Sequence, residues 1–567
     1  MKLINHAYLI FLYKIIVFIA ITLLFTIWGC DSDTPVDTSE IEKVAHDTRI
    51  STNQTWNAKQ VHIVTNDLVI ENAVLTIEPG ATVQFSANTG LYIKSGGGLT
   101  AQGTSDSPVI FTGTESIAGH WNAIAFSAGC NSSQCKLIHA VIEYGGSSDS
   151  TSAQLISEDA APTISHCQVR NSASNGVIIA GVVGPDEFSY NTVTLNRHAP
   201  ILISAQLVPT IHENCDFSGN GRDVIRIHKN GNIRSNTSWS AFNVPYQIAE
   251  DLYISNSTLT ILPGVMLQFE AGTAVEVRAG GALWAEGAVT NPITFTAMAA
   301  QKGYWEGIAF FDGAKDDVCK LANCVLEYGG GNPQRSGLIY CEYASPAIVS
   351  CQVLNSIGYG IIFVGDSHPS VFDNNTITLN EKAPIRIPAE HVSVISPGNY
   401  FGNANDYIEI IGGNISANCF WQNPGISYRL MGSINILNNT LTLLPGTKIE
   451  MEADVSINVK MGGALRADGT SNQIIFTGSV PRPGHWNYIH FNGDCNDVSC
   501  LLNYCLISYG GGDEGWPGSV YCENSSPTIT NCRIENSATW GIYLSGNAQP
   551  DTTGTTFSGN EKGTIWP

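Results

Sequence analysis

Short apolar runs rich in β-branched residues recur along the chain from about residue 50 onward, and Gly, Asn, Pro and Ser separate them. In the first third of this region the runs include residues 163–164, 176–179, 192–195, 201–203 and 225–227. The apolar residues do not follow the spacing of a helix, so the runs predict strands of three to five residues. Because the pattern returns roughly every 22–27 residues, two or three strands with their turns make one rung of a parallel β-helix.

A longer repeat of roughly 183 residues divides this region into three copies. The motif LTIEPG at residues 75–80 returns as LTILPG at 259–264 and as LTLLPG at 441–446. Three tryptophans at nearly constant offsets, Trp121, Trp305 and Trp486, mark equivalent positions. We therefore expect about 22 rungs in three tandem modules at residues 50–231, 232–414 and 415–567, the last of them incomplete. We also expect the modules to repeat the same face.

Small or amide-bearing residues recur after successive apolar runs and predict a stacked, inward-facing turn. In the first copy this column is Ala140, Cys167, Asn191 and Cys215, one residue for each expected rung. An amide at such a turn can bond to the turns above and below it. The same alignment predicts that Arg386 and Glu409 lie one above the other as an exposed ion pair.

Four motifs together resemble the right-handed parallel β-helix repeat proteins of bacteria, which are related in fold to pectate lyases. They are LTIEPG, GGGLTAQGT at residues 96–104, the Trp-x-x-Ile-x-Phe run from Trp121, and SPTITNCRIENS at residues 526–537. The resemblance covers essentially residues 50–567 and implies an all-β fold, a right-handed single-chain solenoid. It does not choose a function, because this fold hosts lyases, hydrolases, epimerases, adhesins and inert rods.

Residues 1–29 resemble a bacterial lipoprotein signal peptide. Lys2 and Lys14 precede an apolar run at residues 15–28, which is short for a membrane span, and the run ends before Gly29 and Cys30. Cys30 is then the lipidated residue, and residues 30–49 are an acidic tether. The alternatives are an ordinary signal peptide cut nearby or an uncleaved anchor. We expect a lipid-anchored protein of the cell envelope, on the outer membrane or cell surface rather than the inner membrane.

The formal net charge of −22 excludes nucleic acid as a partner, since phosphates would repel the chain. Only 13% of residues are charged and 43% are hydrophobic, which is enough for a continuous core. The acidic balance serves solubility or attracts cations. The third copy stops at Pro567, equivalent to about Leu202, which predicts an open strand edge that self-associates, or a chain shorter than its natural length.

Fifteen cysteines raise the question of disulfides, which exported proteins can form. Cys130 and Cys135 match Cys495 and Cys500, and each pair lies within one loop. At the two equivalent loop positions the second copy has Ala314 and Cys319, so one partner is missing. We predict loop disulfides in the first and third copies as candidates, and no zinc site, because histidines do not accompany the cysteines.

A charged cluster breaks the repeat in the first copy and supports an alternative, a polysaccharide lyase or hydrolase acting on an acidic polysaccharide. Its members are Asp186, Glu187, Arg197, His198, Arg222, Asp223, Arg226, His228 and Lys229. In this alternative the catalytic residues are Arg226, Asp223, Asp186, Glu187 and His228, and carboxylates bind Ca²⁺, the one cofactor considered. An organised Asp-His-Asp signature is absent, so salt bridging between rungs on a solvated face is the favoured explanation of the cluster.

Exposed aromatic residues differ between the copies and could stack on sugar rings. The candidate ligand-binding residues are Trp284, Tyr359, Trp516 and Trp540. Scattered single aromatics are also ordinary surface features. The favoured interpretation is a non-catalytic cell-envelope lipoprotein that presents a repetitive β-helix surface for binding or adhesion, with polysaccharides or other cell-surface ligands as partners.

Overall fold

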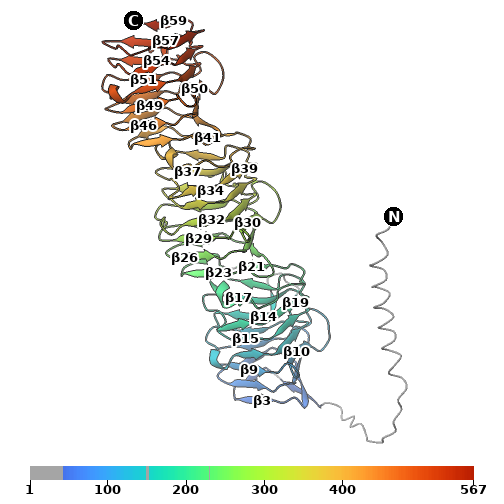
Figure 1. Ribbon diagram of the computed structural model, residues 1–567. Coiled ribbons are helices and arrows are strands. Elements are labelled where there is room, and N and C mark those ends of the chain that lie inside the picture. The colour runs from blue at the N-terminus through green and yellow to red at the C-terminus, as the bar shows by residue number, and fades with distance from the viewer. Residues whose placement is uncertain (1–41, 47, 148–151, 229) are drawn as a thin grey trace, which may run out of the picture. The chain divides into compact units, whose positions relative to one another are not determined.

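The computed structural model describes residues 42–567 apart from residues 47, 148–151 and 229. Residues 43–567 form one unit, a right-handed parallel β-helix of about 21 turns, one fewer than the sequence predicts. Figure 1 shows its strands stacked turn on turn from β3 (Gln54–Trp56) to β59 (Gly563–Trp566). The expected fold class is therefore confirmed.

One turn of the solenoid contains three short strands, each in a different sheet. In the first copy β10 (Val109–Gly113), β11 (Ile124–Phe126) and β12 (Lys136–Ile138) make such a turn. The next turn places β13 (Ala140–Glu143), β14 (Ala153–Glu158) and β15 (Thr163–Ser165) on them in parallel. Alternate residues of each strand point inward, as Val109 and Phe111 do, and join one continuous hydrophobic core.

The inner column of turn residues is confirmed. The backbone N–H of Cys167 donates to the Asn191 side-chain oxygen at 2.9 Å, and the Asn191 amide donates to the Ile164 carbonyl at 2.9 Å. Both side chains are buried. One amide therefore joins its own turn to the turn below, which satisfies polar groups that a buried corner would otherwise leave unpaired.

Equivalent strands of successive copies do not stack on one another. β7 (Thr82–Phe85) is equivalent to β27 (Met266–Phe269), because each strand directly follows its copy of the LTIEPG-like motif. Yet β27 lies in the sheet of β8 (Leu91–Ile93), the strand that follows β7 in the same turn. Seven successive strand pairings, one for each turn, separate β8 from β27. Because β8 itself lies one face after β7, one copy spans seven complete turns and one further face of the solenoid. The expectation that the copies repeat the same face is wrong.

Three sets of strands, one in each copy, are structurally equivalent and matter for the site. Face 1 comprises β5 (Leu68–Ile70), β8, β11, β14, β17 (Asn175–Ala180), β20 (Ile201–Ile203) and β21 (Ile225–Ile227). Face 2 comprises β25 (Leu252–Ile254), β28 (Ala274–Val277), β31 (Gly307–Phe310), β34 (Gly337–Glu342), β37 (Tyr359–Val364), β40 (Ile385–Ile387) and β41 (Tyr407–Ile410). Face 3 comprises β45 (Ile434–Leu437), β48 (Ile457–Lys460), β51 (Ile489–Phe491), β54 (Gly518–Glu523), β57 (Trp540–Ser545) and β59.

Helical structure in the described residues is confined to four short 3₁₀ segments. They are η1 (Ser132–Gln134), η2 (Ala205–Thr210), η3 (Ala389–Val394) and η4 (Asp497–Ser499). Among the described residues none of the helices has the length and apolar character needed to cross a bilayer. The signal segment and Cys30 lie outside the described residues, whereas residues 42–46 of the expected tether form the strand β1 (Glu42–His46).

Candidate functional site

The middle residue of each short strand in faces 1, 2 and 3 points away from the core, and parallel pairing stacks these residues into a column. We call this column the outer strip. On face 1 it is Val69, Tyr92, Ala125, Ile156, Ile178, Leu202 and Arg226. On face 2 it is Tyr253, Glu276, Ala309, Tyr340, Ile362, Arg386 and Glu409. On face 3 it is Asn435, Asn458, His490, Tyr521, Tyr543 and Trp566.

The three outer strips have different chemistry although the cores beneath them are alike. The strip is largely apolar on face 1, rich in charged residues on face 2, and aromatic over four successive turns on face 3. Core positions are constrained by packing, whereas outward positions are free to change. Differences between the copies at the outer strip therefore mark it as the surface where a binding function can reside.

The aromatic residues of face 3 contact one another in order along the strip. The ring centroids lie 4.5 Å apart from His490 to Tyr521, 5.6 Å from Tyr521 to Tyr543 and 6.4 Å from Tyr543 to Trp566. Two flanking indoles join this ladder: Trp516 lies 5.0 Å from Tyr521, and Trp540 lies 5.1 Å from Trp566. We call these six residues the aromatic strip.

Buried rings of the aromatic strip support other rings of the strip that are exposed to solvent. Tyr521 is only 1% exposed, and its hydroxyl lies 2.8 Å from the Ser545 hydroxyl. Trp516 and Trp566 are 42% and 43% exposed. Each aromatic contact stabilises the arrangement by about 0.5–1.5 kcal/mol. The result is a supported apolar surface on which the C–H face of a sugar ring could stack.

The histidine at the first turn of the aromatic strip, His490, is shifted toward its neutral form by burial. Burial lowers the pKa of His490, and Glu523 opposes that shift with its carboxylate 3.2 Å from the His490 Nε2 atom. Burial therefore favours the neutral imidazole, whose ring stacks on Tyr521.

The structure brings together two of the four aromatic residues predicted from the sequence. Trp516 and Trp540 both belong to the aromatic strip. Tyr359 is only 8% exposed, so its expected exposure is wrong: its hydroxyl donates to a Glu409 carboxylate oxygen at 2.9 Å. Trp284 lies on another sheet, in β29 (Ala282–Glu286), with the Lys320 ammonium 5.0 Å from its ring.

Sequence reasoning missed the core of the aromatic strip. His490, Tyr521, Tyr543 and Trp566 do not stand out as turn residues, because each is the second or later residue of a strand. A signal existed: the first three have apolar residues on both sides, which is the pattern of an outward position in a strand buried on one face. Aligning those positions across the turns would have revealed the strip.

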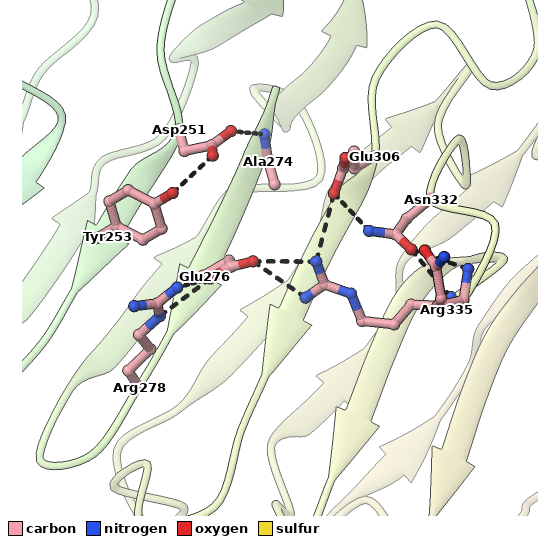
Figure 2. A network of polar contacts seen from close by, with 9 residues as sticks. Asp251, Tyr253, Ala274, Glu276, Arg278, Glu306, Asn332 and Arg335 are labelled. Carbon is pink, nitrogen blue, oxygen red and sulfur yellow. Dashed lines mark hydrogen bonds and ion pairs between the residues drawn. The ribbon is translucent and has the colours of Figure 1, made fainter. Parts of the chain in front are cut away.

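The outer strip of face 2 carries a network of ion pairs instead (Figure 2). Arg335 reaches from the loop before β34 and its guanidinium lies 3.1 Å from Glu276 and 3.3 Å from Glu306. Arg278 pairs with the other oxygen of Glu276, and Asn332 donates to Glu306 at 2.8 Å. Arg335 occupies the loop position that Trp516 has in the third copy, so the same loop contributes charge to one strip and an indole to the other.

The expected pairing of Arg386 with Glu409 is confirmed in register and distance. The two residues are paired on adjacent strands, and the Arg386 Nε atom lies 3.2 Å from Glu409. Glu409 is however buried, with 5% exposure, because the Tyr359 hydroxyl and ring cover it. The expectation that this pair is exposed is therefore wrong for the carboxylate.

The charged cluster considered for catalysis is only partly assembled: His198, Arg222 and Arg226 line one small cavity, whereas the carboxylates of the cluster do not line it. Glu187 lies on β18 (Glu187–Ser189), in a different sheet from Arg226 on β21, and Asp186 precedes β18. Asp223 accepts hydrogen bonds from the backbone N–H groups of Gly219 and Asn220 at 3.0 and 2.7 Å, which makes it a turn residue.

Two further basic members of that cluster have carboxylate partners. Arg226 lies 3.0 Å from Glu270, and His228 lies 3.3 Å from Glu250. Lys229 lies outside the described residues. Within the described part of the chain, no three His, Cys, Asp or Glu side chains are grouped so that they could hold a metal ion.

The four cysteines expected in loop disulfides are thiols in this structure, and the members of each pair contact each other. A hydrogen bond with the Cys135 thiol lowers the pKa of Cys130 to about 7. In the third copy, a hydrogen bond with Cys495 likewise lowers the pKa of Cys500. Disulfide formation stays a prediction.

Comparison with known proteins gives one match. Residues 48–157 match the family model described as the pectate-lyase-like beta helix domain. The matched segment lies in the first copy and reaches from β2 (Arg49–Ile50) into β14. No curated protein and no solved structure matches the chain.

Proposed function

Since the chain is a β-helix repeat protein with a pectate-lyase-like domain, which indicates a carbohydrate-related protein, we propose that it binds glycans without cleaving them. The observation that carries the proposal is the aromatic strip of face 3. Its exposed indoles, Trp516 and Trp566, offer apolar surface, and buried rings hold it in place. Rigid aromatic side chains bind with a small loss of conformational entropy.

The geometry of the strip suits an extended ligand. Ring-to-ring distances of 4.5–6.4 Å follow the rise from one turn to the next along four turns. A chain of sugar residues laid along the strip would meet an aromatic side chain at each turn. Several weak contacts in a row would then add to a useful affinity.

The proposal extends to location. A lipid on Cys30 would hold the protein on the cell envelope, at the outer membrane or cell surface, where polysaccharides or other cell-surface ligands are within reach. Support comes from the apolar run that ends at Gly29 and Cys30. Incorporation of labelled fatty acid into the chain, and its loss in Cys30→Ser, tests this part.

The test of the binding proposal is a glycan array with the chain from Asp31 to Pro567. The double variant Trp516→Ala and Trp566→Ala should weaken binding of the best glycan by roughly tenfold or more. Trp284→Ala is the matched control, since this indole lies on another sheet, and the affinity of this variant should stay near that of the unmodified chain.

Two outcomes would contradict the proposal. One is equal binding by the unmodified chain and the double variant. The other is release of unsaturated or reducing products from pectate, alginate or other uronates, with or without Ca²⁺, which would establish an enzyme instead.

A further inference from the structure

A small cavity opens on face 1, far along the chain from the aromatic strip and independent of the proposed function. Its volume is about 180 Å³, and Asn175, His198, Ala199, Arg222 and Arg226 line it. These residues come from three successive turns: β17, the turn before β20, and the turn and strand of β21. Backbone bonds fix this stacking, because His198 N–H donates to the Ser174 carbonyl and Arg222 N–H donates to the His198 carbonyl.

The other copies show why this cavity exists. Asn175 is equivalent to Tyr359 in the second copy and to Trp540 in the third. The Tyr359 ring fills the corresponding space, with Lys382 4.9 Å and Arg386 5.7 Å from its centre. Trp540 packs on Trp566. Only the first copy has a short side chain here, and the Asn175 amide donates to the Ser152 carbonyl at 2.9 Å.

Two residues at the same place differ in charge between the copies. Arg226 is equivalent to Glu409, and Arg222 is equivalent to Asn405. The second copy therefore presents a buried carboxylate below an aromatic ring, whereas the first copy presents two guanidinium groups around an open space. The two arginines of the first copy occur in a chain with a net charge of −22, so they oppose the general composition.

Positive charge in the cavity is only partly compensated. Arg226 lies 3.0 Å from Glu270. Among the described residues, no carboxylate lies at ion-pair distance from Arg222 or Arg197, and the adjacent Asp223 is engaged by backbone N–H groups. Partial burial lowers the pKa of His198, and the positive charges of Arg197 and Arg222 lower it further. The cavity is thus a place where an anion would be favoured.

We propose that this cavity binds a compact oxyanion, a sulfate, phosphate or carboxylate group, between Arg222 and Arg226. Arginine is suited to this task, because its planar donors match oxyanions in pairs. The volume is below the roughly 300–1,000 Å³ typical of pockets for drug-sized molecules, so a single small group fits and a large cofactor does not. Nearby buried residues Ala199, Leu202 and Val224 form an apolar cluster that would contact the carrier of the charge.

The test is calorimetric titration of the full chain with sulfate, phosphate and acetate at constant ionic strength. Arg222→Gln should weaken binding of the preferred anion by about tenfold, since a hydrogen bond to a charged group is lost. Lys382→Gln is the matched control, because it also removes one exposed positive charge, at the same turn position as His198, beside a filled cavity. It should leave the affinity within about twofold.

A second variant fills the space without changing charge. Asn175→Tyr copies the second copy and should abolish binding, while thermal unfolding reports whether the chain still folds. If the Asn175→Tyr variant does not fold, the anion affinities of Arg222→Gln and Lys382→Gln are sufficient to test the proposal. Equal weakening by those two variants, or no binding of any of the three anions to the unmodified chain, would overturn the proposal. A sugar sulfate, sugar phosphate and uronate, titrated next to the free anions, distinguishes a glycan substituent from an inorganic ion.

Discussion

At the scale of single residues, buried asparagines hold successive turns together. Asn380 is 1% exposed; its side-chain oxygen accepts the Ser356 N–H at 2.9 Å, and its amide donates to the Val353 carbonyl and to Asn403. No apolar residue can replace this set of bonds. Such groups join neighbours above and below, so their loss affects more than one turn.

We predict that Asn380→Ala destabilises the solenoid by about 1–3 kcal/mol, because a buried backbone N–H and a carbonyl lose their partner. Chemical unfolding gives the free energy, and hydrogen exchange should show that faster exchange centres on β37 and β40. Asn66→Ala, at an exposed position, is the control and should change stability by less than about 0.5 kcal/mol. An equal effect of both variants would show that the amide ladder contributes nothing.

A second residue-scale prediction concerns two histidines at the first turns. The rings of His46 and Trp56 are stacked at 3.9 Å, and the His46 Nε2 atom lies 3.0 Å from the His62 Nδ1 atom. Burial and, to a smaller extent, the charge of His62 together lower the pKa of His46 to about 4. The pKa of His62 is also lowered, chiefly by burial.

Because the folded state binds these protons less readily than the unfolded state, local stability is complete above about pH 6.5 and falls as pH drops from there toward 4. Hydrogen exchange of β1 and β4 (Gln60–Val64) at pH 7 and pH 5 measures this loss. The double variant His46→Gln and His62→Gln should remove most of the pH dependence. An unchanged pH profile in that variant would assign the effect to other groups.

At the scale of strands and loops, the short strands follow from the sequence, while the strip on their outer side does not. Alternation within LTILPG-like runs fixes which residues point inward. Which outward side chains become stacked depends on how the residues of one turn pair with those of the next. Loops of variable length between the strands conceal this pairing register in the sequence. Trp516 and Trp540 were visible as unusual aromatics; Tyr521, which they flank, was visible only once the turns were aligned.

The cysteine loops provide the prediction for this scale. Because the Cys130 thiol has a pKa of about 7 and contacts Cys135 across η1, we expect oxidised glutathione to convert this pair into a disulfide, with two glutathione thiols as the reduced product. The pair Cys495 and Cys500, across η4, should react in the same way. Cys319, with Ala314 at the partner position, should remain reduced or form a mixed disulfide.

Mass spectrometry of peptides after alkylation of the remaining thiols measures the pairing. Each loop disulfide lowers the peptide mass by two hydrogens relative to the reduced form. Cys135→Ser provides the control: without a partner in its loop, Cys130 should either stay alkylatable or carry a glutathione mixed disulfide, and it should form no loop disulfide. Pairing of Cys130 with any cysteine outside its loop would contradict the predicted arrangement.

At the scale of the whole solenoid, the three copies differ in the direction and in the chemistry of their outer strips. Sequence repetition predicts three similar sites on one face. The strand pairing instead places the equivalent strands of successive copies in different sheets, one face apart. The copies therefore do not combine into one long, uniform binding surface. Repeat length alone does not reveal this, because a copy of a given length can be divided into turns in more than one way.

The stoichiometry of glycan binding follows from this arrangement. Only face 3 carries the aromatic strip, so we predict one glycan bound per chain rather than three. Calorimetric titration with the best glycan from the array measures the number of sites. Substitution of Tyr359 should leave both the number and the affinity unchanged, because its ring is buried against Glu409. Three equal sites would contradict assignment to the aromatic strip.

The additional face in each copy also bears on how such a chain can lengthen. A duplicated segment has to begin where its predecessor ends, and the three-sided solenoid offers a matching parallel edge on every side. A segment of seven turns and one face can therefore continue the parallel backbone hydrogen bonding as well as a segment of whole turns. In this chain each repeat interval exceeds whole turns by one face, so each copy presents its outer strip on a different side of the solenoid from the copy before it.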